Sequence, residues 1–220
     1  MHVAVVTGAN RGIGLELARQ LKARGASVVA VCRRSSPELD ALGVRVESGL
    51  DVTEPAAWST LALRLAHDDI DLLIHNAGVL LADSLDDVEP DDVRAQFALN
   101  AIAPLFLTRA LAPRLHPGAK VALITSRMGS IGDNTSGGDY GYRMSKAALN
   151  AAGVSMARDL APRGVSVVIL HPGAVRTGMT GGQGVLEPDE SASGLLRRID
   201  ELRLETTARF LHQSGDILPW

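Results

Sequence analysis

The chain has 220 residues, of which 46% are hydrophobic and 21% are charged, and its formal net charge at pH 7 is -3. These values are typical of one globular domain with a sizeable core, and they give no basic footprint for nucleic acid or an anionic membrane. The single cysteine, Cys32, excludes an internal disulfide, and the six histidines lack the paired spacing of metal ligands.

Apolar, strand-like runs alternate with helical stretches along the chain. We expect strands at Val3–Val6, Val28–Cys32, Val44–Glu47, Ile70–Ile74, Val121–Ile124 and Val165–Leu170. We expect helices up to about residue 25 and at about 55–67, 90–115, 141–161 and 188–204. This βαβα order predicts the α/β class: a Rossmann-type, doubly wound parallel sheet in a three-layer α/β/α sandwich. A single domain of residues 1–220 accounts for the chain, with residues 178–205 as a substrate loop and helix.

A glycine-rich turn joins the first predicted strand to the first predicted helix. Gly8 allows a tight turn, Gly12 allows the backbone to approach a ligand, and Gly14 allows the helix to pack on the strand. The free N–H groups at the start of the helix then form a site for a pyrophosphate. We therefore expect cofactor-binding residues here, with an ordinary βα loop as the alternative. They are Gly8, Asn10, Arg11, Gly12, Ile13 and Gly14.

The residues after the second strand bear on which dinucleotide binds, because ligands of such sheets lie beyond the carboxyl ends of the strands. Many NAD-binding proteins end this strand with an acidic residue that holds the ribose 2′-hydroxyl. Here Cys32 takes that position and Arg33 follows. The planar guanidinium of Arg33 matches a 2′-phosphate, and Arg11 adds a second positive charge. The pattern favours NADP(H) over NAD(H), unless Arg33 and Arg34 form only a solvated pair.

Tyr142 and Lys146 lie four residues apart in the predicted helix 141–161, so their side chains share a face. A free tyrosine has a pKa of about 10 and is a poor base near neutrality, and a nearby ammonium lowers that pKa. Tyr142 would exchange a proton with a carbonyl or alcohol oxygen, which Ser126, after the fifth strand, would also hydrogen-bond. A surface pair and a capping hydroxyl are the alternatives.

Asn100 lies inside the predicted helix 90–115, where asparagine is a poor helix former. Pro104 has no N–H, so the carbonyl of Asn100 loses its helical partner. That carbonyl is free to hold a water that links Lys146 to solvent and completes a proton relay. A kinked helix without a chemical role is the alternative.

Together these motifs resemble the short-chain dehydrogenase/reductase family over about residues 3–177. Further matches are His75-Asn76-Ala77-Gly78 after the fourth strand and Pro172-Gly173 after the sixth, although most relatives carry asparagine where this chain has His75. The long segment 126–142 and the Gly-Asp-x-x-Pro-Trp ending resemble the small carbonyl-reductase-like branch, which is related to bacterial cell-contact signalling factors (C-factors).

The resemblance implies a catalytic set of Asn100, Ser126, Tyr142 and Lys146, and a set of cofactor contacts. Asp51 would accept a hydrogen bond from the adenine amino group, unless it serves only the start of the next helix. Lys146 would hold the nicotinamide ribose, and Val175 and Thr177 would hold the nicotinamide carboxamide. The other implied contacts are Val52, Asn76, Ala77, Gly78, Tyr142, Pro172 and Gly173.

The sequence thus predicts an NADP(H)-dependent oxidoreductase that reduces a ketone or aldehyde, or oxidises the corresponding alcohol, by hydride transfer. The alternatives are an NADP(H)-binding redox sensor with little turnover, and an isomerase or epimerase. We expect the pocket walls near residues 80–85, 127–139 and 178–186, of which the third is a glycine-rich loop that can close over a ligand.

The expected surroundings of the protein follow from the same features. The first strand begins near residue 2, which leaves no room for a signal peptide, and no apolar run approaches the roughly 18 residues of a membrane span. We expect a cytoplasmic protein with a small-molecule carbonyl or alcohol substrate, and no metal, nucleic-acid or membrane partner. The resemblance implies a homodimer or homotetramer formed through the two long helices.

Overall fold

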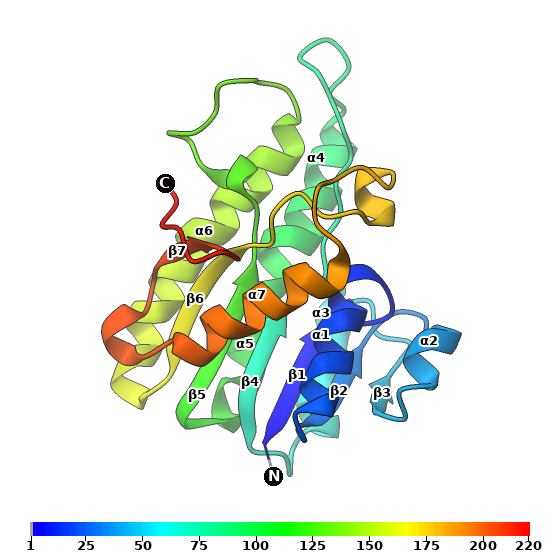
Figure 1. Ribbon diagram of the computed structural model, residues 1–220, viewed down its shortest axis with the longest axis vertical. Helices are drawn as coiled ribbons and strands as arrows, with labels where there is room; N and C mark the ends of the chain where they lie inside the picture. The colour runs from blue at the N-terminus through cyan, green and yellow to red at the C-terminus, as the bar shows by residue number, and fades with distance from the viewer. Residues whose placement is uncertain (1) are drawn as a thin grey trace.

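The computed structural model describes residues 2–220 and contains one parallel sheet of seven strands (Figure 1). The strand order is β3-β2-β1-β4-β5-β6-β7, so the chain reverses its direction of travel across the sheet between β1 and β4. The strands are β1 Val3–Thr7, β2 Ser27–Val31, β3 Arg45–Glu47, β4 Ile70–His75, β5 Leu115–Ile124, β6 Ser166–His171 and β7 Phe210–His212. This order and the parallel pairing confirm the predicted Rossmann-type, doubly wound fold.

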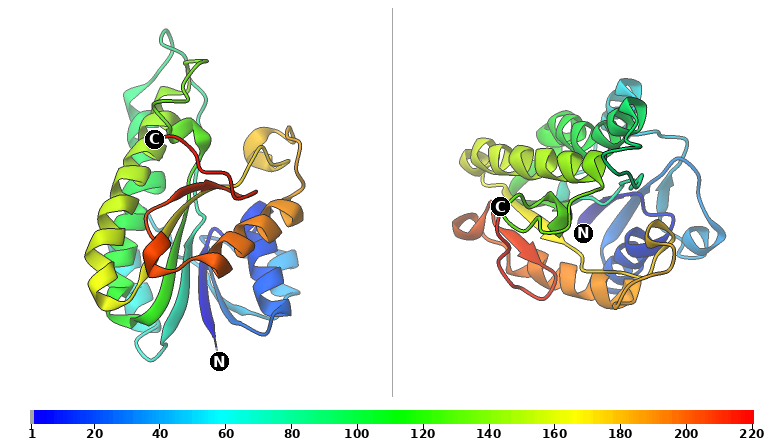
Figure 2. Two further views of the ribbon diagram at one scale, coloured as in Figure 1. Left: turned by 60° about the vertical axis from the view of Figure 1, so that its left-hand side comes forward. Right: turned by 90° about the horizontal axis from the view of Figure 1, so that it is seen from above.

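Helices cover both faces of the sheet, with α3 to α6 on one side and α1 and α7 on the other (Figure 2). Successive residues of β1 face opposite layers: Val5 packs under α3, α5 and α6, whereas Ala4 and Val6 pack under α1 and α7. Strands buried on both faces read as continuous apolar runs, which is why they were visible in the sequence. The helices are α1 Gly12–Ala23, α2 Pro37–Asp40, α3 Pro55–Arg64, α4 Pro90–Phe97, α5 Ala103–Leu111, α6 Tyr140–Leu160 and α7 Pro188–Glu201.

The predicted strands and helices are confirmed to within a few residues, apart from three differences and an interruption of the predicted helix 90–115. Strand β5 begins at Leu115 instead of Val121. Two short elements were not predicted: β7 (Phe210–His212) and α2 (Pro37–Asp40), a single turn whose first N–H groups include one bonded to the Ser36 hydroxyl. Elements of three or four residues are too short to show a hydrophobic period.

The predicted helix 90–115 is interrupted in the middle. Residues 98–102 form one turn of π-helix between α4 and α5, closed by a bond from the N–H of Ala103 to the carbonyl of Ala98. Pro104, which cannot donate to Asn100, lies just after it, as expected for an interrupted helix. Contrary to expectation, the stretch Pro90–Arg114 is long and apolar enough to cross a membrane by length and composition. Its buried side chains, including Leu107 and Leu111, belong to the core beneath the sheet.

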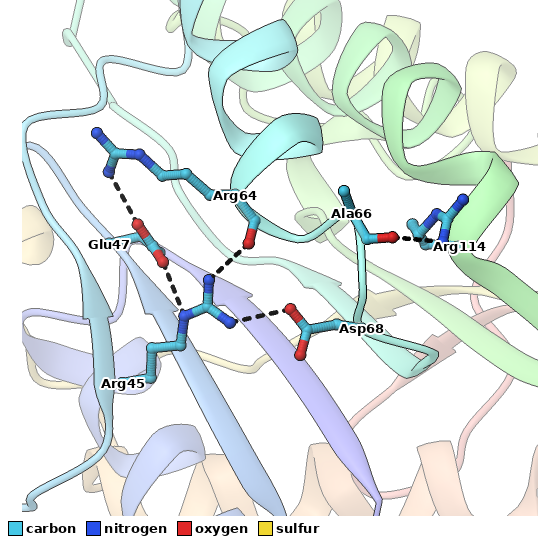
Figure 3. Close-up of polar contacts among 6 residues, drawn as sticks. All are labelled: Arg45, Glu47, Arg64, Ala66, Asp68 and Arg114. Atoms are coloured by element: carbon cyan, nitrogen blue, oxygen red, sulfur yellow. Dashed lines mark hydrogen bonds and ion pairs between the residues drawn. The ribbon is translucent and has the colours of Figure 1, made fainter.

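A network of charged side chains ties the edge strand β3 to the end of α3 (Figure 3). The two oxygens of Glu47, 10% exposed, each lie 2.8 Å from an arginine nitrogen, one from Arg45 and one from Arg64. Arg45 also donates to Asp68 at 2.9 Å and to the main-chain carbonyl of Arg64 at 2.8 Å. Burial works to raise the pKa of Glu47, but the two arginines outweigh it and hold that pKa below its usual value.

We expect Glu47→Ala to lower the free energy of unfolding by about 2 kcal/mol, because it removes charge-assisted hydrogen bonds and leaves two half-exposed guanidinium groups without their shared partner. Urea denaturation followed by circular dichroism measures this. The control is Glu205→Ala, an exposed carboxylate without an ion pair in residues 2–220, for which we expect less than about 0.5 kcal/mol. Equal losses in the two variants would show that the network does not stabilise the edge.

Candidate active site

A cleft of about 910 Å³ lies at the carboxyl edge of the sheet. This is the upper end of the strands in Figure 1. Residues from the ends of β1, β2, β4, β5 and β6, from the loop after β3 and from α6 line it. The structure therefore brings together most of the predicted site residues. Those that line the cleft are Gly8, Asn10, Arg11, Gly12, Ile13, Arg33, Asp51, Val52, Asn76, Ala77, Gly78, Tyr142, Lys146, Pro172 and Thr177.

The glycine turn is held against the end of β4. Asn76 donates its side-chain amide to the carbonyls of Thr7 and Gly8 at 3.1 and 3.2 Å. In return, the Thr7 hydroxyl accepts from the N–H groups of Asn76 and Ala77, both at 3.1 Å. Gly8 has φ +67° and a Cβ on it would lie 2.9 Å from the Cα of Ala77, while a Cβ on Gly14 would clash with the carbonyl of Gly8. Only glycine fits at these two positions.

The start of α1 fits a dinucleotide. Arg11 precedes the helix in an extended conformation, and its side chain makes no capping hydrogen bond within the described chain. The first N–H groups of α1 are therefore free beside the cleft, at the positive end of the helix dipole. Gly12 has φ +53°, and a Cβ on it would lie 3.4 Å from the methyl group of Thr177, so the turn and the segment after β6 are neighbours in the cleft. A turn without side chains and with free N–H groups is the cradle that a pyrophosphate needs.

Arg33 and Asp51 form the far end of the cleft. Their charged groups lie 3.6 Å apart, and the Arg33 side chain is 72% exposed. The other Asp51 oxygen accepts from the N–H and hydroxyl of Thr53, at 3.0 and 2.7 Å, in the turn before α3. Burial tends to raise the pKa of Asp51, but the bonds from Thr53 and the charge of Arg33 hold it below its usual value. Asp51 thus fits both roles considered for it, and Arg33 leaves most of its donors open to an anion.

Tyr142 and Lys146 lie side by side on α6 at the floor of the cleft, 7% and 4% exposed. The ammonium of Lys146 is 5.7 Å from the centre of the Tyr142 ring and donates to the carbonyl of Ile124 at 2.9 Å. Ser126 accepts from the N–H of Met128 at 3.1 Å, so its capping role is real, and its own proton stays available to a substrate.

The expectation that Lys146 lowers the pKa of Tyr142 is wrong for this structure. Burial raises the pKa of Tyr142 to about 12, against a smaller opposing effect of the Ser126 hydroxyl. Burial also lowers the pKa of Lys146 to about 8. Removal from water dominates both shifts, and each group moves toward its neutral form. Near neutral pH Tyr142 therefore keeps its proton and can act as a proton donor.

Asn100 is fully buried, and its side chain bonds to protein groups instead of facing the cleft. Its amide accepts from the N–H of Val79 and donates to the carbonyl of Val79, both at 2.9 Å. It also donates to the Ser145 hydroxyl at 2.9 Å, which connects α6 to the π-turn. The relay through its main-chain carbonyl stays a prediction.

Five predicted site residues are not among those that line the cleft: Gly14, Asn100, Ser126, Gly173 and Val175. Fewer residues of the predicted pocket walls line the cleft than expected. From residues 80–85 only Leu81 lines it, and from residues 178–186 only Gly178 and Met179. No residue of 127–139 lines it. Val175 is 3% exposed and pairs with Leu186 in an isolated bridge. This bridge joins the end of the segment 178–186 to the chain just after β6.

Several buried polar residues that shape the site were missed in the sequence. Asn150, one turn after Lys146, accepts from the Thr125 hydroxyl at 2.7 Å and donates to the carbonyl of Gly129 at 3.2 Å. It thereby fixes the end of β5 on α6. Gln96, one turn before Asn100, is likewise fully buried. The available signal was an amide side chain four residues from a predicted site residue, on the same helical face.

This geometry is shared with known proteins. A family model described as short chain dehydrogenase matches residues 2–185. The chain belongs to the short-chain dehydrogenase/reductase family. It is 42% identical over 226 residues, covering both chains fully, to 1-hydroxy-2-glutathionyl-2-methyl-3-butene dehydrogenase of Rhodococcus sp. (strain AD45). It is 49% identical over 154 residues to the C-signal protein of Myxococcus xanthus, covering 69% of this chain and 93% of that one.

The fold is also that of solved members of the family. The NADPH-bound carbonyl reductase from chicken fatty liver superposes with a TM-score of 0.90 at 32% identity, covering 100% of this chain and 98% of that chain. The family resemblance seen in the sequence is thereby confirmed, including its carbonyl-reductase-like character at the level of structure.

His75 is the point where this short-chain dehydrogenase/reductase departs from the asparagine of most relatives. Its side chain is 3% exposed and Nε2 lies 2.8 Å from the Thr108 hydroxyl of α5. Burial lowers the pKa of His75 to about 3, so the ring is neutral at the carboxyl end of β4. His75 does not line the cleft; it joins β4 to α5.

A buried neutral histidine makes stability depend on pH. The unfolded chain binds a proton at His75 below its ordinary pKa of about 6.5, whereas the folded chain does so only near 3. The contribution of the neutral His75 to the free energy of unfolding is therefore fully present well above pH 6.5, and it is lost as the pH falls toward 3. Relative to His75→Asn, we expect the wild type to lose about 1.2 kcal/mol more between pH 6 and pH 5. Urea unfolding at the two pH values measures this, with the exposed His67→Asn as control; parallel losses in wild type and His75→Asn would contradict it.

Proposed function

We propose that this protein is an NADPH-dependent carbonyl reductase that acts on a small ketone or aldehyde, with Tyr142 as the proton donor. The observation that carries the proposal is that a buried, protonated tyrosine and the glycine turn for a pyrophosphate line one continuous cleft. A redox sensor needs only the turn, because binding a dinucleotide requires neither Tyr142 nor Ser126. The NADPH bound to the structurally similar chicken carbonyl reductase supports the same cofactor here.

In this proposal each residue of the cleft has a defined task. The cofactor supplies the hydride, and the protein supplies position and protons. The N–H groups at the start of α1 bind the pyrophosphate, and Arg33 binds the 2′-phosphate. Tyr142 donates its proton to the substrate oxygen, and Ser126, whose lone pair already accepts from Met128, donates a hydrogen bond to the same oxygen.

Lys146 supports the proton transfer. Its ammonium uses one hydrogen bond on the carbonyl of Ile124 and keeps two donors for the cofactor ribose and for a relay to solvent. The relay would continue to water held at the π-turn by the main-chain carbonyl of Asn100, to which Pro104 has no N–H to donate.

The name of the Rhodococcus relative points to an alcohol that carries a glutathionyl group on the neighbouring carbon. We therefore propose that a carbonyl compound or alcohol with a bulky polar substituent belongs in the first set of substrates to be assayed. The similarity to C-signal favours one second candidate, a signalling protein that binds NADP(H) with little turnover. A steady-state assay distinguishes the two candidates, because only the reductase turns over a carbonyl substrate at a substantial rate.

We also propose a cytoplasmic protein that forms a homodimer or homotetramer. Three half-exposed apolar side chains on the outer face of the helical layer support an assembly: Ile102 in the π-turn, Leu105 in α5 and Met144 in α6, at 43%, 40% and 49% exposure. The lone buried cysteine, Cys32, is compatible with a reducing compartment.

We expect Tyr142→Phe to lower kcat for carbonyl reduction by at least about 100-fold, because it removes the hydroxyl that donates the proton and keeps the ring. Binding of NADPH, measured by its fluorescence, is expected to stay within about twofold of the wild type. Tyr140→Phe is the matched control, since Tyr140 lies on the same turn but outside the cleft lining, and it should retain full activity. Turnover that survives in Tyr142→Phe would sink the catalytic assignment.

We expect Arg33→Ala to raise the Kd for NADPH about tenfold and to leave the Kd for NADH unchanged. The removed contact is one charge-assisted interaction in a mostly exposed setting, worth about 1.4 kcal/mol. Arg34→Ala is the control, with an expected change below about twofold. A loss of NADPH affinity in Arg34→Ala instead would assign the phosphate to the second arginine, and equal losses for NADPH and NADH would mean that neither reads the 2′-phosphate.

A further inference from the structure

The segment after β4 is fastened to the helical layer by two side-chain amides in series. Asn100 pairs with both main-chain groups of Val79, at 2.9 Å each. Gln96 pairs in the same way with Leu81, accepting from its N–H at 3.1 Å and donating to its carbonyl at 3.2 Å. Each amide therefore replaces the partner that a neighbouring strand would provide.

The pairing repeats at a regular spacing. Gln96, near the end of α4, and Asn100, in the π-turn, are four residues apart, and their partners Leu81 and Val79 are two residues apart. The two amides therefore hold residues 79–81 in one register along this helical segment. Val79 and Leu81 also line the cleft, so this register sets one wall of the substrate space.

The segment ends on the helix that carries Tyr142. Helix α6 begins after Asp139, which has φ +50° and gives no side-chain cap. Asp83 takes over the cap from 56 residues earlier in the chain: its carboxylate accepts from the N–H groups of Tyr140 and Gly141, the latter at 3.1 Å. Its carbonyl also accepts from the N–H of Asp139 at 2.8 Å. One aspartate thus holds the first turn of α6, two residues from Tyr142.

Gln96 reaches the same turn directly. It is fully buried, and a Cβ on Gly141 would clash with its side-chain nitrogen, so Gly141 and Gln96 are in close contact. A buried amide whose oxygen and nitrogen are both hydrogen-bonded favours a single arrangement of its partners, because an unpaired one is costly. The first turn of α6 is therefore held by two side chains. Gln96 contacts it at Gly141, and Asp83 accepts hydrogen bonds from its first N–H groups.

We propose that Gln96 and Asp83 are positioning residues for proton donation by Tyr142, with Gln96 fixing the segment after β4 at Leu81 and Asp83 fixing the first turn of α6. Neither residue lines the cleft, so both act through Tyr142 and the wall residues. The catalytic part of this inference rests on the proposed reductase function. The mechanical link, by which Gln96 holds the first turn of α6, is independent of that function.

The catalytic part is tested with Gln96→Met, which keeps the length of the side chain and removes its hydrogen bonds, and with Asp83→Ala. We expect kcat to fall about 10- to 100-fold in both, as for a small misplacement of a reacting group, and the Kd for NADPH to stay within about twofold. Asp83→Asn retains an acceptor and should recover part of the loss. The matched control is Asp86→Ala, an exposed aspartate of the same loop. Unchanged kcat, or equal losses in Asp86→Ala, would overturn the positioning role.

The mechanical link is tested by amide hydrogen exchange with the same proteins, without substrate. In Asp83→Ala we expect faster exchange at Tyr140 and Gly141, and in Gln96→Met faster exchange at Leu81 and at both of these amides. Exchange at Tyr140 and Gly141 that is unchanged in Gln96→Met would overturn the link. A wild type that binds NADPH but reduces no carbonyl would overturn the proposed function and the catalytic role together, while the exchange data would still decide the link.

Discussion

The junction between the ends of β1 and β4 is the constraint on which the cleft depends. Asn76 and Thr7 join the two strands through four hydrogen bonds between residues almost seventy positions apart. The strand order reverses at this point, so the connections leave in opposite directions and a crevice opens between them. The glycine turn can present its N–H groups to that crevice only because the Asn76 amide holds its carbonyls from behind.

Buried amides repeat this function along the rest of the site. Asn100 and Gln96 hold the segment after β4, and Asn150 holds the end of β5. Burying an amide is unfavourable unless its donors and acceptors are bonded, so each of these side chains favours one placement of the loop it holds. The loops that form the cleft are therefore positioned by polar contacts with the helical layer, whereas the apolar cores on the two faces fix the strands and helices.

The sequence was sufficient where the signal is local. Continuous apolar runs predicted the central strands, and the glycine turn and the Tyr142–Lys146 pair could be placed from their spacing. Three things required the structure. The contact between Asp83 and α6 joins distant parts of the chain and leaves no local pattern. The short strand β7 has too few residues to show a period. The direction of the Tyr142 pKa shift depends on burial, which the i, i+4 spacing does not report.

That shift bears on the direction of the proposed reaction. The low-polarity floor of the cleft moves both ionisable groups toward neutrality, raising the pKa of Tyr142 to about 12 and lowering that of Lys146 to about 8. Reduction of a carbonyl uses the proton that Tyr142 already holds at neutral pH. Oxidation of an alcohol needs the tyrosinate, and so requires the pKa of Tyr142 to fall by several units first. Additional positive charge beside Tyr142 would be needed for that change, because the Lys146 ammonium is itself destabilised by burial. Without a ligand, the cleft therefore holds Tyr142 in the protonated form that the proposed carbonyl reduction uses.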